Sequence, residues 1–195
     1  MGDQLPYVDF GTNFIVQAIS LGLDHTCALS TIGQVKCFGD NKAGQLGLGH
    51  LNPMGDSVDE VGDHLPVVAF GTGLEATSLA AGGYHNCVIL SDDSVRCWGL
   101  NKTGQLGAGH NLSVGGEEGQ MGDMLVPVNF NYQRRPVRLR LGEAHSCVLF
   151  TDNQMKCWGR NGSGQLGVGD VVERGTHPLD DVGTLPLVSL GHAQM

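Results

Sequence analysis

The sequence lacks the long apolar runs and the basic surplus that mark several common classes of protein. No stretch reaches the roughly 18 consecutive apolar residues of a membrane span, so we expect none. Its 11 basic residues against 20 acidic ones give a formal net charge of -9, which argues against a general binder of nucleic-acid phosphates. With 31 glycines and only 6% aromatic residues, the composition favours many tight turns over long helices.

Sequence motifs for catalysis, phosphate binding and metal binding are also missing. The chain has no Gly-Lys-[Ser/Thr] turn, and its cysteines are not spaced as the Cys-x-x-Cys pairs of structural zinc sites. Among the residues that occur once, no nucleophile, base or metal constellation stands out. The sequence therefore predicts no enzyme activity, no metal site and no cofactor.

What the chain does contain is a 60-residue period, repeated three times in register. A repeat of this length is typical of an array of similar units that stack to bury a common core. One active site needs only one set of residues, so the positions shared by all copies are expected to be scaffold and function to lie in the differences. The positions assigned to the scaffold include His25, His85 and His145; Gly39, Gly99 and Gly159; Asn41, Asn101 and Asn161; Gln45, Gln105 and Gln165.

Alternation and turn residues in the second copy predict four short strands, over residues 75–81, 86–91, 94–99 and 125–130. Asp92 and Asp93 supply the turn between the second and third strands, and Pro127 suits an edge strand. Repeated four-stranded units of this size are the blades of a β-propeller.

The segment HNCVILSDDSVRCWGLNKTGQLGAG and its two counterparts resemble the repeat of the RCC1-like (regulator of chromosome condensation) family. This resemblance implies a β-propeller, usually of seven blades, that serves mainly as a platform for other proteins. The chain has three copies, each lengthened by an insert such as residues 50–62. We therefore predict an all-β fold, a partial β-propeller of about three four-stranded RCC1-like blades.

The phase of the repeat suggests how the chain divides. Residues 1–14 are expected to form the outer strand of a preceding blade, followed by RCC1-like repeats over residues 15–70, 71–130 and 131–195. Since both ends fall inside the pattern, we expect further blades of a longer parent chain, with self-association as the alternative.

The six cysteines form three pairs whose partners are ten positions apart, and each pair flanks a predicted hairpin turn. The pairs are Cys27 and Cys37, Cys87 and Cys97, and Cys147 and Cys157. Such pairs suit cross-strand disulfides, but buried free thiols explain them equally well, so both interpretations stay open. Oxidised pairs would place the chain outside the cell, and free thiols in the cytoplasm.

Candidate partner-binding residues lie where the copies differ. The acidic candidates are Asp56, Asp59, Glu60, Glu117 and Glu118, and the basic ones are Arg134, Arg135, Arg138 and Arg140. Arg138 and Arg140 replace small residues of the other copies on one strand face, which suggests an anion or carboxylate site near the channel. The favoured alternative is pairing with local acids such as Glu117, Glu118 or Glu143.

These features favour a non-catalytic interaction scaffold that binds a protein partner through loops between strands. The resemblance implies one alternative, guanine-nucleotide exchange on a small GTPase, which some members of the family perform. The cysteine pairs support another, a secreted disulfide-bonded binding or inhibitor propeller.

Overall fold

The structure is a computed structural model that describes residues 6–131 and 134–188. Nine strands form three antiparallel sheets, each of three consecutive strands. The first sheet holds β1 (Val16–Leu21), β2 (His25–Ser30) and β3 (Val35–Gly39), the second β4 (Ala76–Ala81), β5 (His85–Leu90) and β6 (Val95–Gly99), and the third β7 (Pro136–Leu141), β8 (His145–Phe150) and β9 (Met155–Gly159). Short 3-10 helices lie in the inserts: η1 (Val58–Glu60), η2 (Gly62–His64), η3 (Gly122–Met124), η4 (Pro178–Asp180) and η5 (Val182–Thr184).

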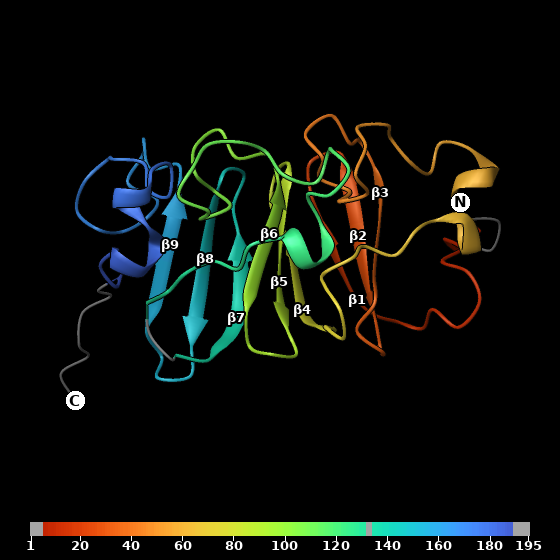
Figure 1. The fold of residues 1–195 in the computed structure, drawn as a ribbon, viewed down its shortest axis with the longest axis horizontal. Helices are drawn as coiled ribbons and strands as arrows, with labels where there is room; N and C mark the ends of the chain where they lie inside the picture. The colour runs from red at the N-terminus through yellow and green to blue at the C-terminus, as the bar shows by residue number, and fades with distance from the viewer. Residues whose placement is uncertain (1–5, 132–133, 189–195) are drawn as a thin grey trace.

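The three sheets stand side by side as three blades, with β1 to β3 at one end of the molecule and β7 to β9 at the other (Figure 1). The first strands of neighbouring blades contact one another, β1 with β4 and β4 with β7. The long inserts line the upper edge in Figure 1, and the turns between the second and third strands lie at the lower edge. None of the helices in the described ranges is long and apolar enough to cross a membrane.

The predicted partial propeller and the first three strands of each blade are confirmed. In the second copy, β4, β5 and β6 differ from the predicted ranges by one residue at some ends. Their register is repeated in every blade, so that Cys27 lies opposite Cys37 and Cys87 opposite Cys97. A bulge near the start of each first strand, as between Ala76 and Ser78, also recurs in all three blades.

The predicted fourth strand, residues 125–130, is reduced to a short contact with β6. In the part of the chain that the structure describes, it makes a bridge between Pro127 and Arg96, and the Val128 amide donates to the Val95 carbonyl at 2.8 Å. Pro127 has no N–H to extend the ladder, so a regular strand is interrupted there. At the chain start, where residues 1–14 were predicted to form an outer strand, residues 6–14 carry no strand structure and residues 1–5 lie outside the described residues.

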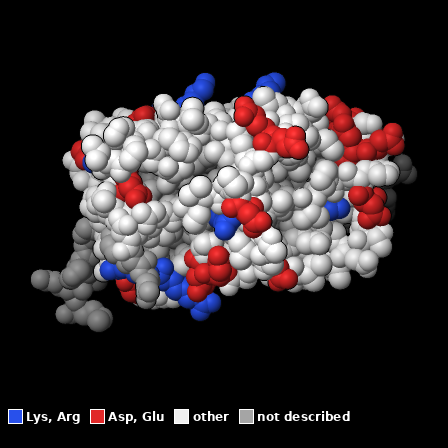
Figure 2. Space-filling model, viewed as in Figure 1, with Lys and Arg blue, Asp and Glu red and all other residues white. Residues whose placement is uncertain are grey.

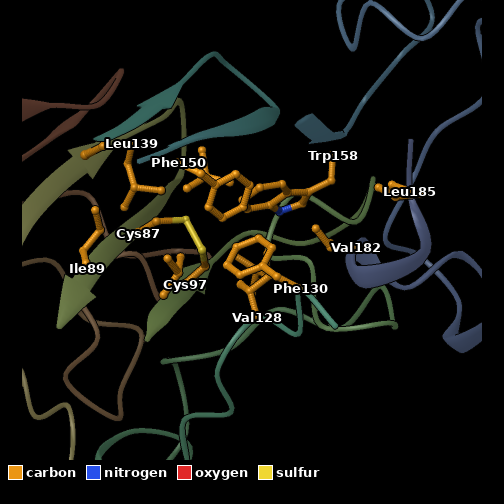
Figure 3. Close-up of a cluster of buried hydrophobic side chains, with 14 residues drawn as sticks. Cys87, Ile89, Cys97, Val128, Phe130, Leu139, Phe150, Trp158, Val182 and Leu185 are labelled. Atoms are coloured by element: carbon orange, nitrogen blue, oxygen red, sulfur yellow. A yellow bond between two sulfur atoms is a disulfide. The ribbon is translucent and has the colours of Figure 1, made fainter. Parts of the chain in front are cut away.

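The core lies between the blades. Phe150 and Trp158 of the third blade and Phe130 of the preceding loop pack against the Cys87–Cys97 disulfide of the second blade (Figure 3). Phe130 and Phe150 meet edge to face, with ring centroids 5.3 Å apart. An equivalent cluster around Trp98 and Phe70 joins the first two blades. Each blade therefore depends on its neighbour to bury its apolar side chains, as expected of a repeat array.

The two end faces of the row differ in character. On β1, Ile19 and Leu21 are each 64% exposed. Leu139, the counterpart of Ile19 on β7, is fully buried against the second blade, and Leu141, the counterpart of Leu21, is partly buried. On the opposite end, β7 exposes Arg138 and Arg140, at positions where β4 has the partly buried Ser78 and the buried Ala80.

Candidate partner-binding face

The shared histidines connect neighbouring blades. His25 Nε2 donates to Asn86 Oδ1 at 3.0 Å, and His85 Nε2 bonds Ser146 Oγ at 2.9 Å. Both partners lie on the second strand of the next blade. His145 occupies the same position in the third blade.

The hydrogen bonds around His85 fix its tautomer. Ser146 Oγ donates to the Gln105 carbonyl at 2.8 Å, so its lone pair must accept the proton of His85 Nε2. His85 Nδ1 is then the unprotonated nitrogen, and it is buried without a hydrogen-bond partner among the described residues. Burial, reinforced by the nearby His25 and His145, lowers the pKa of His85 to about 3.

The shared asparagine and glutamine organise the turn after each third strand. Asn41 Nδ2 donates to the His50 carbonyl at 2.7 Å, and its Oδ1 accepts from the Leu46 amide at 2.9 Å. Gln45 Oε1 accepts from the Ala43 amide at 2.8 Å. The same contacts recur at Asn101 and Asn161 and at Gln105 and Gln165.

The shared glycine at the end of each third strand is required by space and by backbone angle. Gly99 has a φ of +102°, and a Cβ there would stand 2.4 Å from the Tyr84 carbonyl oxygen. Gly39 and Gly159 occupy the same position with φ values of +112° and +105°.

All six cysteines form disulfides: Cys27–Cys37, Cys87–Cys97 and Cys147–Cys157. Each joins residues directly opposite on the second and third strands, with a Cα–Cα distance of 4.1 Å. This short spacing is typical of a non-hydrogen-bonded antiparallel pair. Because the sulfur atoms are bonded to one another, they are not available to a His-Cys-Cys metal site. No group of three or more metal-ligating side chains occurs within residues 6–131 and 134–188.

A groove of about 510 Å³ crosses the loop edge between the first and second blades. Its lining combines carboxylates, apolar side chains and two lysines: Asp24, Asp40, Glu117, Leu51, Leu100, Tyr84, Lys42 and Lys102, with Ala43, Ser113, Gly116 and Gln120. The second insert forms one wall, because it lies on the first blade: the Gly49 amide donates to the Gly115 carbonyl at 3.0 Å.

Tyr84 and Asp24 face each other across this groove. The Tyr84 hydroxyl donates to Asp24 Oδ2 at 3.3 Å, and the negative charge of Asp24 raises the pKa of the Tyr84 hydroxyl. Neither residue is part of the shared scaffold, since the three copies have Asp24, Tyr84 and Ala144 at this position. Sequence analysis missed both residues, although their variation within an otherwise fixed motif was a usable signal.

The acidic candidates divide between two places. Asp56, Asp59 and Glu60 lie in the first insert, on and just before η1, where Glu60 accepts from the Gly55 amide at 2.9 Å. Figure 2 shows acidic atoms gathered at the end of the molecule where Figure 1 places η1 and η2. Glu117 and Glu118 are exposed in the second insert, and Glu117 lines the groove.

The four arginines are not brought together into one site. Arg134 pairs with Asp152 at 2.7 Å and Arg135 with Asp93 at 3.0 Å, near the lower edge. These acids are not the predicted partners Glu117, Glu118 and Glu143, because the hairpin turns approach more closely than the inserts do. Arg138 and Arg140 are exposed on β7, and Arg140 donates to the Leu139 carbonyl.

Each blade also contains a buried or partly buried basic side chain that was not predicted from the sequence. Lys36 Nζ donates to the Phe10 and Gly62 carbonyls at 2.8 and 2.9 Å. Arg96 donates to the equivalent carbonyls of Phe70 and Gly122, and Lys156 donates to those of Val182 and Gly183. The signal was a basic residue before the second cysteine of every copy, and its role is to fasten the outer loops to the third strand.

Comparison with known proteins agrees with this architecture. The sequence model of the Regulator of chromosome condensation (RCC1) repeat matches residues 16–45, 76–105 and 139–165. The chain is 32% identical to the Ultraviolet-B receptor UVR8 of Arabidopsis thaliana over 160 residues, which cover 80% of this chain and 32% of the receptor. It is 29% identical to the X-linked retinitis pigmentosa GTPase regulator homolog of Caenorhabditis elegans, covering 81% of this chain and 10% of that protein. The chain thus spans a third or less of the length of these relatives.

Solved structures give the same fold. The crystal structure of yeast RCC1 (Prp20) bound to Kap60 matches with a TM-score of 0.64 at 22% identity, over 84% of this chain and 34% of that one. The Prp20p structure from Saccharomyces cerevisiae, described with its binding properties to Gsp1p and histones, gives 0.63 at 22% identity, over 84% and 35%. The three blades of this chain are therefore repeats of the regulator of chromosome condensation (RCC1) family.

Proposed function

We propose that the chain is a non-catalytic binding module that recognises a protein partner through its loop edge, the edge formed by the turns after each first strand and the inserts after each third strand. The observation that carries this proposal is the division between shared and variable positions. The shared histidines, asparagines and disulfides are buried or mostly buried, and they make contacts within the chain. The inserts, in contrast, differ in sequence between copies and expose many of their side chains.

Exposed aliphatic side chains on the inserts support this proposal. Leu51 is 52% exposed and Leu112 is 68% exposed, and Val171 and Val172 hold matching positions on the third insert at 64% and 56%. Apolar side chains surrounded by polar loops are the usual centre of a protein interface.

A peptide-display selection on the immobilised full chain tests the proposal. The loop-edge variant Leu112→Glu/Val172→Glu is compared with Ile32→Glu/Thr151→Glu, which adds the same charges at exposed positions on the hairpin turns of the opposite edge. We expect the wild-type chain and the second variant to retain the selected binders and the loop-edge variant to lose most of them. Equal retention by both variants, or no enrichment on the wild type, would contradict the proposal.

We further propose that the module works in an oxidising compartment, because structural disulfides form and persist there and are rare in a reducing cytosol. Intact mass after blocking free thiols, on protein purified without reductant, tests this directly. Six protected cysteines are expected. Six free thiols would instead support an intracellular role, and nucleotide exchange on a small GTPase would then become the assay of choice.

A further inference from the structure

We propose that the groove between the first and second blades receives a basic side chain, arginine or lysine, from the partner protein. This inference rests on the proposed function and specifies the chemistry of one contact on the loop edge. Its occupant is defined by charge and shape: an alkyl stem with a cationic head.

The acidic groups of the groove are available to such a cation. Asp24 is exposed, accepts a bond from the Tyr84 hydroxyl, and forms no ion pair with a lysine or arginine among the described residues. Glu117 is exposed and accepts from the side-chain amide of Gln120 at 3.3 Å. Both carboxylates therefore keep lone pairs directed to solvent, where a guanidinium or ammonium group can donate.

The rest of the lining suits the stem of a long basic side chain. Leu51 and Leu100 supply apolar surface, and the half-buried Tyr84 ring offers a face to a cation. Asp40 is already paired with Lys42 at 3.2 Å, but the Lys42 side chain is 88% exposed. That pair is screened by solvent and leaves Asp24 and Glu117 as the main acceptors.

The next junction along the array provides an internal comparison. There the position of Asp24 is taken by Tyr84, that of Leu100 by Arg160 and that of Glu117 by His177. The scaffold contacts are the same at both junctions, including the indole bonds from Trp98 to the Gln45 carbonyl and from Trp158 to the Gln105 carbonyl. The acidic character thus belongs to the first junction and is not required for stacking blades.

The experiment uses N-acetyl-arginine methylamide as the probe and its neutral isostere N-acetyl-citrulline methylamide as the comparison. Both are titrated into the full nitrogen-15-labelled chain and followed by backbone amide shifts. We expect the arginine probe to shift the amides of Leu51, Tyr84 and Gly116, and the citrulline probe to bind several-fold more weakly. Asp24→Asn is expected to weaken arginine binding about two- to fivefold, with a further loss in Asp24→Asn/Glu117→Gln.

The matched control is Glu75→Gln, which removes one exposed charge just before β4, outside the groove, and should leave arginine binding unchanged. Equal binding of the two probes, shifts confined to other surfaces, no binding, or an effect of the control as large as that of Asp24→Asn would overturn the inference. If the arginine probe shows no preference for the groove while the display selection still depends on the loop edge, the proposed function stands and only the basic-side-chain contact is wrong.

Discussion

At the scale of single residues, the buried imidazole of His85 contributes to how the protein responds to acid. His85 donates through Nε2 to the next blade, and its Nδ1 lies in a place with no acceptor for a second proton. Protonation would create an unpaired buried N–H and a buried charge, so the folded chain holds this ring neutral.

Stability should therefore fall as the pH falls from about 6.5, the ordinary value for histidine, toward the folded-state pKa of His85 of about 3. In that window the unfolded chain binds the proton and the folded chain does not, so His85 alone contributes a slope of roughly 1.4 kcal/mol per pH unit. Urea unfolding at pH 7.5, 5.5 and 4.5 measures the slope. His85→Gln should reduce it, whereas the exposed His64→Gln should not; an unchanged slope in His85→Gln would refute the assignment.

The position of the His85 ring also explains why residue 82 is a glycine. A Cβ on Gly82 would stand 2.2 Å from His85 Cε1 and 2.6 Å from the Gly142 carbonyl oxygen. Gly82→Ala is therefore expected to lower the unfolding free energy by about 1–3 kcal/mol, through overpacking at the blade junction. Gly162→Ala is the control, since no heavy atom lies within 4 Å of its added Cβ, and thermal unfolding should show little change. Similar melting temperatures for the two variants would show that the junction relaxes freely.

At the scale of elements, the sequence was most informative where the pattern is local. Alternation and turn residues place β4, β5 and β6 nearly to the residue, because each strand pair is closed by its own hairpin turn. The fourth strand could not be judged this way, since Pro127 has no N–H for the ladder and its segment pairs with β6 across the long insert instead of across a hairpin turn. The groove could not be predicted from the sequence either. Asp24 and Glu117 are far apart in sequence and line the same groove only because the second insert lies on the first blade.

The hairpin disulfides should contribute measurably to each blade. Replacing both Cys87 and Cys97 by alanine opens a short covalent loop and leaves a cavity in the core between blades, so we expect a loss of about 2–4 kcal/mol in unfolding free energy. The Cys147→Ala/Cys157→Ala variant provides the comparison in the end blade, where Cys147 is partly exposed and the loss should be smaller. Urea unfolding measures the loss of stability in both variants. A Cys87→Ala/Cys97→Ala chain as stable as the wild type would contradict the prediction.

At the scale of the whole molecule, equivalent residues contribute differently to stability because the row of blades has two ends. Leu139 is fully buried between blades, while its counterpart Ile19 is exposed on the face of the first blade. Both residues occupy the same position of the repeat, and only their place in the array separates them.

Leu139→Ala is therefore expected to destabilise the chain by about 2–5 kcal/mol, whereas Ile19→Ala should change the unfolding free energy by less than about 1 kcal/mol. Chemical unfolding of the two variants at equal protein concentration measures the difference. A comparable loss at both positions would mean that the face of β1 is covered in solution, and light scattering would then show whether a second copy covers it.

The histidine link between blades has a consequence for how such arrays change length. Every unit carries a histidine donor at the start of its second strand and a side chain that can accept on the following residue. In the second blade, His85 donates to the third blade and Asn86 accepts from the first. A duplicated or deleted unit therefore restores both halves of the bond without any compensating substitution. Unequal recombination within the gene could alter the number of blades in a single step, leaving the inserts free to diverge afterwards.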